Sequence, residues 1–400
     1  MIIDLHVHSR FAAACSKNIT IPQLVKWAKI KGLDLLGTGD FTHPVWLGEI
    51  KELLKEKNGF YYYENFPFIL SGEISLIYTQ GRGRRIHLLI FAPNLEIVDK
   101  INAYLDTKGR RDYDGRPIFK IPCDEFVREM RKISKAIEII PAHIWTPWFG
   151  LLGSKSGFDS LKECFKDQVD HIHAIETGMS SDPPMNWKIK ELDNRSIVSF
   201  SDSHSFWPFR LGREATIFKK VNSYMEIIEQ IRKNSFLATI ETDPGYGIYH
   251  YDGHRHCNFS CPPPKTKELN GICPVCGKPL TVGVDYRVEE LAEGGRVIDF
   301  KPKNAKPFYK ILPLHELISL AIGKGMQTSA VWTIYNGLIK EFKNEFNILL
   351  NVSKENLINK NVNEKLIELI LKNREGKIKV VPGYDGVYGK AVSEEKQATL

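Results

Sequence analysis

The chain has 400 residues, 42% of them hydrophobic, which is enough to bury one large core and one or two smaller ones. It contains no run of about 18 apolar residues, and its first residues are too mixed for a signal peptide, so we expect a cytoplasmic protein without a membrane partner. A formal net charge of +7 favours an anionic partner, although many enzymes that bind small phosphates are equally basic.

Seven apolar runs in the first half predict strands, most of which deliver polar residues at their C-terminal ends: Ile2–His8, Leu33–Asp40, Pro67–Glu73, Arg85–Ala92, Ala136–His143, Asp170–Glu176 and Ser196–His204. Amphipathic patterns between most of them predict helices at Ile21–Lys31, with Thr20 as its N-cap, and at Val45–Lys57, Leu95–Leu105, Asp124–Lys135 and Tyr224–Asn234. Alternating strands and helices favour a mainly parallel sheet and, because polar residues end nearly every strand, a closed β/α barrel.

The first strand ends in Asp4-Leu5-His6-Val7-His8-Ser9, which places two imidazoles on one side of the sheet. Such a pair is a candidate metal site. Further candidates end the other strands: Asp40, His43, Glu73, His87, His143, Glu176, Asp202 and His204. Imidazoles mixed with carboxylates that can bridge two ions suggest a multinuclear site for phosphoester hydrolysis. By contrast, we expect His171 and His173 to be ordinary core or surface histidines.

Five of these stretches resemble the motifs of the PHP phosphoesterase superfamily over residues 1–235: Asp4–Ser9, Ser71-Gly72-Glu73, Ile86–Leu89, Pro141-Ala142-His143 and Ser201–His204. The resemblance implies a distorted seven-stranded α/β barrel with two or three divalent ions, such as zinc, manganese or magnesium. It implies one ion held by His6, His8, Glu73 and Asp202, a second held by Glu73, His87 and His143, and catalytic roles for Asp202, Glu73 and His143.

The third ion site departs from the superfamily pattern. His204 would help to hold this ion, but the acid or histidine that many members place soon after the first motif is missing from Phe11–Cys15. Asp40 or His43 is the candidate replacement, and the sequence leaves the choice between them open.

A cysteine cluster follows the predicted barrel. Cys273-x-x-Cys276 followed by glycine is typical of a zinc knuckle, and Cys257 and Cys261 complete four ligands for one structural zinc. Their three-residue gap is wider than the usual two, so His254 or His256 is an alternative ligand. The competing interpretation, four free thiols in a Pro-rich loop, would leave a segment without a core.

The last third begins with a basic linker, Lys301–Pro307, and predicts helices at Leu314–Ile322, Ser329–Phe342, Lys354–Asn359 and Asn363–Asn373. A Gly-rich aromatic turn, Tyr384–Lys390, comes after them. We expect a barrel over residues 1–240, a zinc ribbon over 241–300, a helical C-terminal domain that grips DNA over 301–390, and a flexible tail over 391–400. The alternative for the helical domain is a purely structural bundle.

Barrel, ribbon and helical domain in this order resemble the endonuclease Q family of DNA repair enzymes, supported by Gly39–Pro44, Ile175–Gly178, Ser180–Pro183, Leu211–Ala215 and Gly253–Arg255. The resemblance implies hydrolysis of DNA, double- or single-stranded, on the 5′ side of deaminated bases (uracil, hypoxanthine, xanthine) and abasic sites, and hence association with the nucleoid. A 3′-5′ exonuclease or small-molecule phosphatase on the same barrel, and a DNA-binding scaffold with a dead site, are the rival hypotheses.

Candidate substrate-binding residues occur in loops rich in aromatic, hydroxyl or basic side chains. An enzyme that selects one odd base must flip it out, and aromatic rings can stack on it. The candidates are Trp148, Trp207, Ser180, Ser181, Arg82, Arg84, Arg110 and Arg111, with Arg85, Lys108 and Arg116 in the same basic loops. The alternative is that the aromatics pack the barrel rim and the charges are solvated.

The chain stops at Lys396-Gln397-Ala398-Thr399-Leu400. Gln397-x-x-Leu400 resembles the opening of the motif by which repair enzymes bind the sliding clamp, but its two aromatic anchors are missing. We therefore expect the natural chain to continue, and the sliding clamp to be a partner of the extended form.

Overall fold

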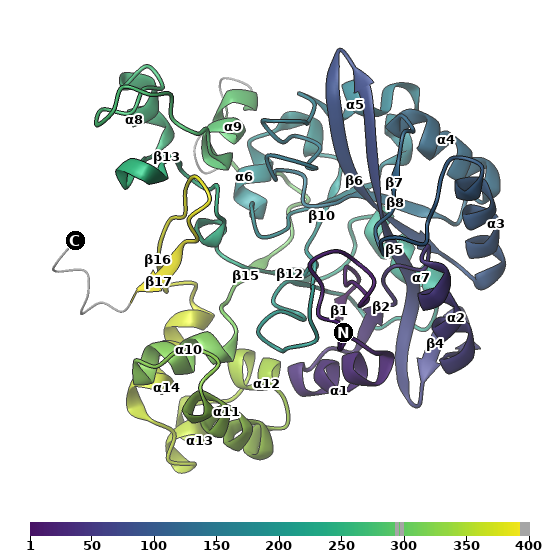
Figure 1. Ribbon diagram of the computed structural model, residues 1–400. Coiled ribbons are helices and arrows are strands. Elements are labelled where there is room, and N and C mark those ends of the chain that lie inside the picture. Colours follow the sequence, from purple (N-terminus) through teal and green to yellow (C-terminus); the bar gives the residue numbers. More distant parts are fainter. Residues whose placement is uncertain (293–295, 297–299, 393–400) are drawn as a thin grey trace.

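The computed structural model describes residues 1–292, 296 and 300–392. Figure 1 shows a large sheet with helices around it, a small segment at one end of the molecule and a helical unit packed beside the first helices of the chain. The expected clamp-binding motif at Gln397–Leu400 lies outside the described residues.

All seven predicted strands form, although most are shorter than the apolar runs: β1 (Ile2–Asp4), β2 (Leu35–Gly37), β5 (Phe66–Gln80), β6 (Arg82–Ala92), β8 (Glu138–Pro141), β9 (Ala174–Glu176) and β10 (Ser196–Val198). Further strands extend the sheet: β3 (Lys55–Lys57), β4 (Phe60–Tyr63), β7 (Ile118–Phe119), β11 (Ala215–Ile217), β12 (Ala238–Glu241) and β15 (Phe308–Lys310). The main sheet runs in the order β15-β12-β11-β1-β2-β5-β4-β3, with β6 between β5 and β8 and β7 beside β5; β9 and β10 form a separate parallel pair.

The sheet is less parallel than the sequence predicts. β1, β2 and β5 are parallel neighbours, but β5 and β6 form a long antiparallel hairpin, and β6 and β8 are also antiparallel. Only Gly81 separates β5 from β6, and one residue cannot make the crossover that a parallel pair needs. Glu73 and His87 consequently lie within this hairpin, rather than at the ends of two parallel strands.

Helices pack around this sheet: α1 (Ile21–Lys31), α2 (Pro44–Leu53), α3 (Leu95–Asp106), α4 (Cys123–Ile133), α5 (Leu161–Phe165), α6 (Pro183–Trp187) and α7 (Tyr224–Arg232). Thr20 caps α1 as predicted, accepting a hydrogen bond from Gln23 N. The helix predicted over Val45–Lys57 is too long. It ends at Leu53 because Asn58-Gly59, both with positive φ, form the turn of the hairpin between β3 and β4.

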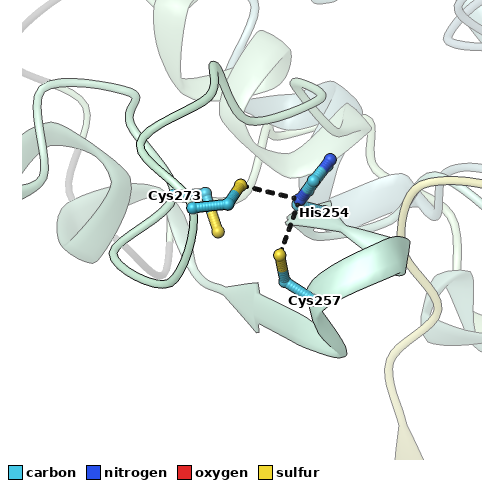
Figure 2. A group of neighbouring side chains, drawn as sticks. His254, Cys257 and Cys273 are labelled. Atoms are coloured by element: carbon cyan, nitrogen blue, oxygen red, sulfur yellow. Dashed lines mark hydrogen bonds between the residues drawn. The ribbon is translucent and has the colours of Figure 1, made fainter.

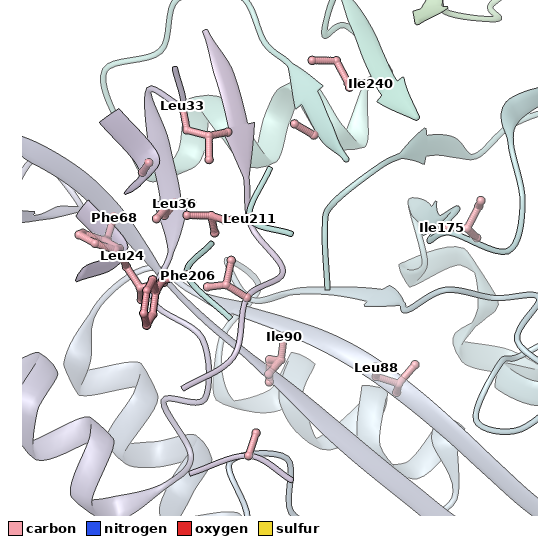
Figure 3. Close-up of a cluster of buried hydrophobic side chains, with 14 of the residues drawn as sticks. Leu24, Leu33, Leu36, Phe68, Leu88, Ile90, Ile175, Phe206, Leu211 and Ile240 are labelled. Atoms are coloured by element: carbon pink, nitrogen blue, oxygen red, sulfur yellow. The ribbon is translucent and has the colours of Figure 1, made fainter. Parts of the chain in front are cut away.

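The central strands of the main sheet, such as β2 and much of β5 and β6, are buried on both faces. On β6, Leu88 and Ile90 belong to the larger apolar cluster, whereas Leu89 and Phe91 belong to a second cluster that includes Ile227 of α7. This alternation follows from the pleat of the strand, which points successive side chains to opposite faces. Figure 3 shows part of the larger cluster, to which separate strands and loops contribute.

The segment after the main strands contains a hairpin of β13 (Asp252–His254) and β14 (Phe259–Cys261), followed by α8 (Pro263–Glu268) and α9 (Val284–Leu291). The helical unit follows, with α10 (Leu314–Ile322), α11 (Ser329–Phe342), α12 (Glu345–Leu350), α13 (Lys354–Asn359) and α14 (Glu364–Arg374). Four of these five match predicted helices, and α12 was not predicted.

A last hairpin, β16 (Lys379–Val381) with β17 (Lys390–Val392), returns to the small segment. There Tyr251 N donates to Gly383 O (3.0 Å). Among the helices that the structure describes, none is long and apolar enough to cross a membrane.

Candidate metal centre

The His-x-His pair lies against the loop that follows β10. Val7 forms a parallel β-bridge with Ser203, which brings the imidazoles on either side of Val7 next to Asp202. Asp202 Oδ1 lies 3.3 Å from His6 Nε2 and 3.1 Å from His8 Nε2. Two segments almost 200 residues apart in the sequence thus build one side of the site.

Glu73 is the centre of the site. Its Oε2 lies 3.6 Å from His6 Nε2 and 3.3 Å from His8 Nε2, and its Oε1 lies 2.8 Å from His87 Nδ1 and 3.1 Å from His143 Nε2. Two groups with metal-ligand geometry therefore share this carboxylate, and their members are His6, His8, Glu73 and Asp202 in one and Glu73, His87 and His143 in the other. These are the two ligand sets that the motifs imply.

Two further carboxylates hold the first imidazoles from behind. Glu176 Oε1 accepts from His6 Nδ1 (2.9 Å) and Asp40 Oδ1 from His8 Nδ1 (2.9 Å). Both contacts leave Nε2 facing Glu73 and Asp202, which is how a carboxylate fixes the tautomer and orientation of a metal-binding histidine. Asp40 therefore lies outside both ligand groups and positions one of their members.

The donor set fits divalent ions. His6 Nε2 is buried without a hydrogen-bond partner among the described residues, although it faces two carboxylates. Burial alone would lower the pKa of His6, but Glu176, Asp202 and Glu73 raise that pKa well above its ordinary value. Burial would raise the pKa of Glu73, yet His87, Arg116 and His6 hold it well below. Imidazole nitrogens and carboxylate oxygens converging in this way suit zinc or manganese.

Three residues of the site have left-handed backbone conformations: Asp40 (φ 43°), His143 (φ 32°) and Asp202 (φ 47°). Each lies just beyond the end of a strand, and strain of this kind persists where the fold requires a particular side-chain direction. Gly178 (φ 58°) supports His143, because a Cβ at this position would lie 2.5 Å from the Cβ of His143.

No third ligand group forms among the residues that the structure describes. His43 stacks on Phe11 with ring centroids 4.2 Å apart, and His204 Nδ1 lies 2.9 Å from the carbonyl oxygen of Asp202. A metal-binding role for either stays a prediction. The expectation for His173 holds, since its Nδ1 pairs with the buried Glu138 (2.8 Å) away from the site.

The cysteine cluster forms, but His254 takes the place of one of the four expected cysteines. His254 Nδ1 lies 3.1 Å from Cys257 Sγ and 3.4 Å from Cys276 Sγ, and Cys273 completes a four-residue group. Figure 2 shows His254 and Cys257 on the hairpin side and Cys273 facing them from the loop beyond. Burial opposes ionisation of Cys273, but the amides of Val275 and Cys276 lower the pKa of its thiol, as a zinc knuckle requires.

Cys261 does not join this group, so the set of four cysteines is corrected. In the hairpin, His254 pairs with Phe259 near the turn, whereas Cys261 pairs with Asp252 two residues further along. Two residues of strand span about 6.6 Å, which removes Cys261 from the turn where the other ligands lie. Its Sγ instead lies 3.3 Å from Thr266 Oγ1.

A cavity of about 380 Å³ opens beside the metal centre, bounded by His143 and Asp202. Of the predicted substrate-binding residues, Trp148 and Ser180 line it. Trp148 packs edge-to-face on Tyr249 (5.4 Å), and Ser180 Oγ is buried with no hydrogen-bond partner among the described residues. Its other lining residues include Arg213, Tyr249 and Tyr388. They were not predicted, because no local pattern marks a residue that only the fold brings to a cavity.

The other candidates lie elsewhere. Ser181 is buried and donates to Thr177 O (3.0 Å), and Trp207 packs on Trp27 (5.2 Å) and Trp332 (5.3 Å). The four arginines already have protein partners: Arg82 with Gly157, Arg84 with Glu163, Arg110 with Asp112 and Arg111 with Asp106. Their part in substrate binding stays a prediction.

Arg116 is the basic residue that reaches the metal centre. Its Nη1 lies 3.1 Å from Glu73 Oε2, and its side chain is only 19% exposed. Burial would lower the pKa of its guanidinium, but Glu73 and Asp202 raise it. The sequence showed only a charged loop here, because nothing local distinguishes Arg116 from Arg110 or Arg111.

Two groups of imidazoles that share one buried carboxylate, on a mixed α/β fold, define a metal-dependent hydrolase of the phosphoesterase type. Two solved structures match this chain over nearly its whole length. A lesion-specific endonuclease from Pyrococcus furiosus, PfuEndoQ, has a TM-score of 0.87 and 30% identity, over 100% of this chain and 98% of that chain. Endonuclease Q in complex with a 27-mer duplex carrying an abasic lesion at the active site has a TM-score of 0.86 and 32% identity, over 99% and 98%. The chain belongs to the endonuclease Q family.

Two sequence relatives also match the chain, and one of them does so over nearly its whole length. The chain is 36% identical to protein MJ0043 of Methanocaldococcus jannaschii over 255 residues, which cover 62% of this chain but only 31% of that protein. It is 26% identical to protein YqxK of Bacillus subtilis over 410 residues, covering 97% of this chain and 98% of that protein. Residues 313–377, which include all five helices of the helical unit, match the family model of the MJ0043 C-terminal domain.

Proposed function

We propose that the protein is a metal-dependent DNA repair endonuclease that hydrolyses the phosphodiester on the 5′ side of deaminated bases (uracil, hypoxanthine, xanthine) and of abasic sites. The observation that carries the proposal is the full-length match to two endonuclease Q structures, of which one holds a duplex with an abasic lesion at its active site. The Glu73-centred ligand groups support a hydrolytic site in this chain.

The strands that carry these ligands support a barrel of seven strands. β1, β2, β5, β6 and β8 are successive neighbours in the sheet, and β9 pairs with β10. Hydrogen bonds link the remaining edges: Ile144 N donates to Glu176 O (3.2 Å), and His8 N donates to Ser203 O (3.0 Å). Closure of this kind explains why side chains from β5 and β6 and from the segments just after β1, β8 and β10 can meet at one centre.

In this proposal His6, His8, Glu73 and Asp202 hold one divalent ion, and Glu73, His87 and His143 hold another. The ions would supply Lewis-acid activation of the attacking water and neutralise charge that builds on the phosphate. Glu73 and Asp202 determine where the ions that neutralise this charge would be held. Glu176 and Asp40 keep His6 and His8 oriented. The His254, Cys257, Cys273 and Cys276 group holds one structural zinc, which supplies folding energy to a small segment.

The cavity beside the centre suits an extruded nucleotide. A damaged base inside a duplex can be reached only after flipping, and deaminated or missing bases cost less to open. Trp148 offers a ring for stacking, and the unpartnered hydroxyl of Ser180 can bond a polar edge of the base. The distance between this cavity and the ligands is short, since His143 and Asp202 belong to both.

The direct test is cleavage of end-labelled duplexes that carry one uracil or one abasic site, with and without Mn²⁺. We expect a single metal-dependent cut on the 5′ side of the lesion and no cut in the undamaged duplex. A lesion placed in covalently closed circular DNA should also be nicked, which an exonuclease that needs an end cannot do. Equal cutting of damaged and undamaged duplexes, or activity on a small phosphate monoester alone, would refute the proposal.

An enzyme with this substrate would work where the chromosome lies, and association with the nucleoid stays a prediction. Binding to the sliding clamp also stays a prediction, because the tail that carries the partial motif is outside the described residues.

A further inference from the structure

The Gly-rich turn between β16 and β17 presents an unusually exposed aromatic side chain. Tyr388 is 65% exposed, the largest fraction among the aromatic residues that the structure describes. Leaving a large ring in water forgoes the free energy of its burial, so an exposed ring on an ordered turn needs an explanation.

The turn itself is held firmly. Tyr384 and Val387 exchange two backbone hydrogen bonds (3.0 and 2.7 Å), and Gly386 N donates to Ile248 O (2.9 Å). Gly389 packs so closely on the backbone of Gly245 that a Cβ there would lie 1.9 Å from its carbonyl oxygen. The backbone on both sides of Tyr388 is therefore fixed against the segment before β13, and its ring is displayed with little freedom left to lose on binding.

Tyr388 also stands at the border of two cavities. One is the cavity beside the metal centre, and the other, of about 440 Å³, lies between the main sheet and the helical unit. The second cavity is lined by three cationic side chains, Arg210, Arg213 and Lys390, and by one carboxylate, Glu316. Arg213 and Met179 border both cavities together with Tyr388, so the two cavities adjoin at this ring.

We propose that Tyr388 stacks on the base of the nucleotide next to the damaged one, while the cationic cavity receives the backbone of that flanking nucleotide. The inference rests on the proposed function, because it assigns the first cavity to the extruded nucleotide. Cations in the second cavity suit phosphate, and Tyr388 lies where a strand running from one cavity to the other must pass. An aromatic face accepts any base, so this contact holds the strand without reading its sequence.

The test compares KM and kcat of Tyr388→Ala, Tyr388→Phe and Tyr388→Trp on a duplex with one abasic site. Loss of one stacking contact should raise KM roughly 5- to 150-fold. Phe and Trp should restore most of the wild-type KM, because they keep the ring. Tyr309→Ala is the matched control, since Tyr309 is also exposed (42%) but lines neither cavity. The melting temperature of each variant checks that the turn still folds.

A second substrate separates stacking from a merely structural role. In this substrate a plain propyl spacer replaces the nucleotide directly 5′ or directly 3′ of the lesion, so that one flanking base is missing without a second abasic sugar. On one of these two substrates, the KM of the wild type should rise about as much as the Tyr388→Ala substitution raises it on the substrate with both flanking bases. The KM of Tyr388→Ala should not rise further on that substrate, because its stacking contact is already lost.

An unchanged KM in Tyr388→Ala would overturn the inference. So would independent effects of the substitution and the missing base, in which the two increases in KM multiply on both flanking substrates. In either case, cleavage by the wild type would leave the proposed function unaffected. Failure of the wild type to cleave any lesion-bearing duplex would instead refute the proposed function. In that case, fluorescence anisotropy with the same duplexes still tests Tyr388, because stacking on the flanking base predicts the same losses in binding.

Discussion

Glu73 connects the two ligand groups through its two carboxylate oxygens, and its environment explains why it can stay charged. The side chain is fully buried, but His87, His143 and Arg116 all lie within 3.1 Å of its oxygens. Asp202 Oδ1 lies within 3.3 Å of His6 and His8 and 3.6 Å from His204 Nδ1, and Asp202 belongs to one of the two ligand groups. The two carboxylates should therefore differ in how many ions depend on them.

Substitution of Glu73 and Asp202 tests this difference. Glu73→Gln should lower the barrel metal content by two ions per chain, whereas Asp202→Asn should lower it mainly by one, since only one group includes Asp202. Both should reduce cleavage by roughly 100-fold or more and leave DNA binding largely intact, because the grip on phosphates lies elsewhere. Elemental analysis by mass spectrometry and a cleavage assay give the two readouts. Full activity of Asp202→Asn would contradict the assignment of Asp202 to a metal site with His6, His8 and Glu73.

Arg116 supplies a fixed positive charge at the same centre, and a planar guanidinium is well suited to the oxygens of a phosphodiester. We expect Arg116→Met to lower kcat by roughly 100- to 1000-fold without loss of metal, with Arg116→Lys falling between it and the wild type. Arg111→Met is the control, because Arg111 belongs to the same loop but pairs with Asp106. Loss of metal in Arg116→Met would show that the residue holds the ligands together rather than the substrate.

At the scale of elements, short hairpins decide which side chains meet. The turn between β13 and β14 brings His254 and Cys257 to the loop of Cys273 and Cys276, and it leaves Cys261 at the far end of its strand. The β5–β6 hairpin likewise brings Glu73 and His87 within reach of each other, because Glu73 and Ser75, the partner of His87, are two residues apart.

Three single substitutions test the zinc ligand set. Cys276→Ser and His254→Ala should each lose one zinc per chain and lower the melting temperature, because a structural ion contributes its binding energy to folding. Cys261→Ser should keep the zinc. Metal content and thermal unfolding are the measurements. Zinc lost from Cys261→Ser and retained by His254→Ala would restore the four-cysteine set.

At the scale of the whole molecule, a buried ion pair joins the first helix to the helical unit. Lys31 Nζ lies 2.7 Å from Glu345 Oε1, with both side chains at most 1% exposed, and it also donates to Pro208 O (2.8 Å). Glu345 Oε2 accepts from Tyr335 OH (2.9 Å). Beside this pair, Trp27, Trp207 and Trp332 pack together, so charge and aromatic surface fix the two parts of the molecule against each other.

Removal of Lys31 should be costly because it leaves Glu345 buried and unpaired. Lys31→Met should lower the free energy of unfolding by about 3–5 kcal/mol, and adding Glu345→Gln should recover much of it. Lys29→Met on the same helix is the control, since its pairing with Glu64 is on the surface (3.6 Å) and is worth less than about 1 kcal/mol. Urea titrations measure the three variants. An equal, small effect of both lysines would contradict this account of the interface.

Local sequence determined the longer helices and the seven strands that carry the candidate site, but it did not show most of the short elements between them. Apolar runs located all seven strands, and amphipathic spacing with Thr20 as a cap located helices such as α1 and α10. The six-residue α12 was missed because so short a helix shows hardly more than one period of its pattern. The members of the two candidate ligand groups were also readable from sequence, since imidazoles and carboxylates within or just after apolar strands are rarely placed there for packing.

Only the tertiary structure decided which of these residues meet. Asp40 and Glu176 end strands just as the ligands do, yet they contact histidine Nδ1 atoms and not the centre, which depends on directions set by the neighbouring loops. His254 takes the place expected for Cys261 because hairpin register is a property of two strands. Arg116 and Tyr388 reach the site through contacts across more than 40 residues of sequence. Short-range pattern fixes secondary structure, but long-range packing fixes where its side chains point.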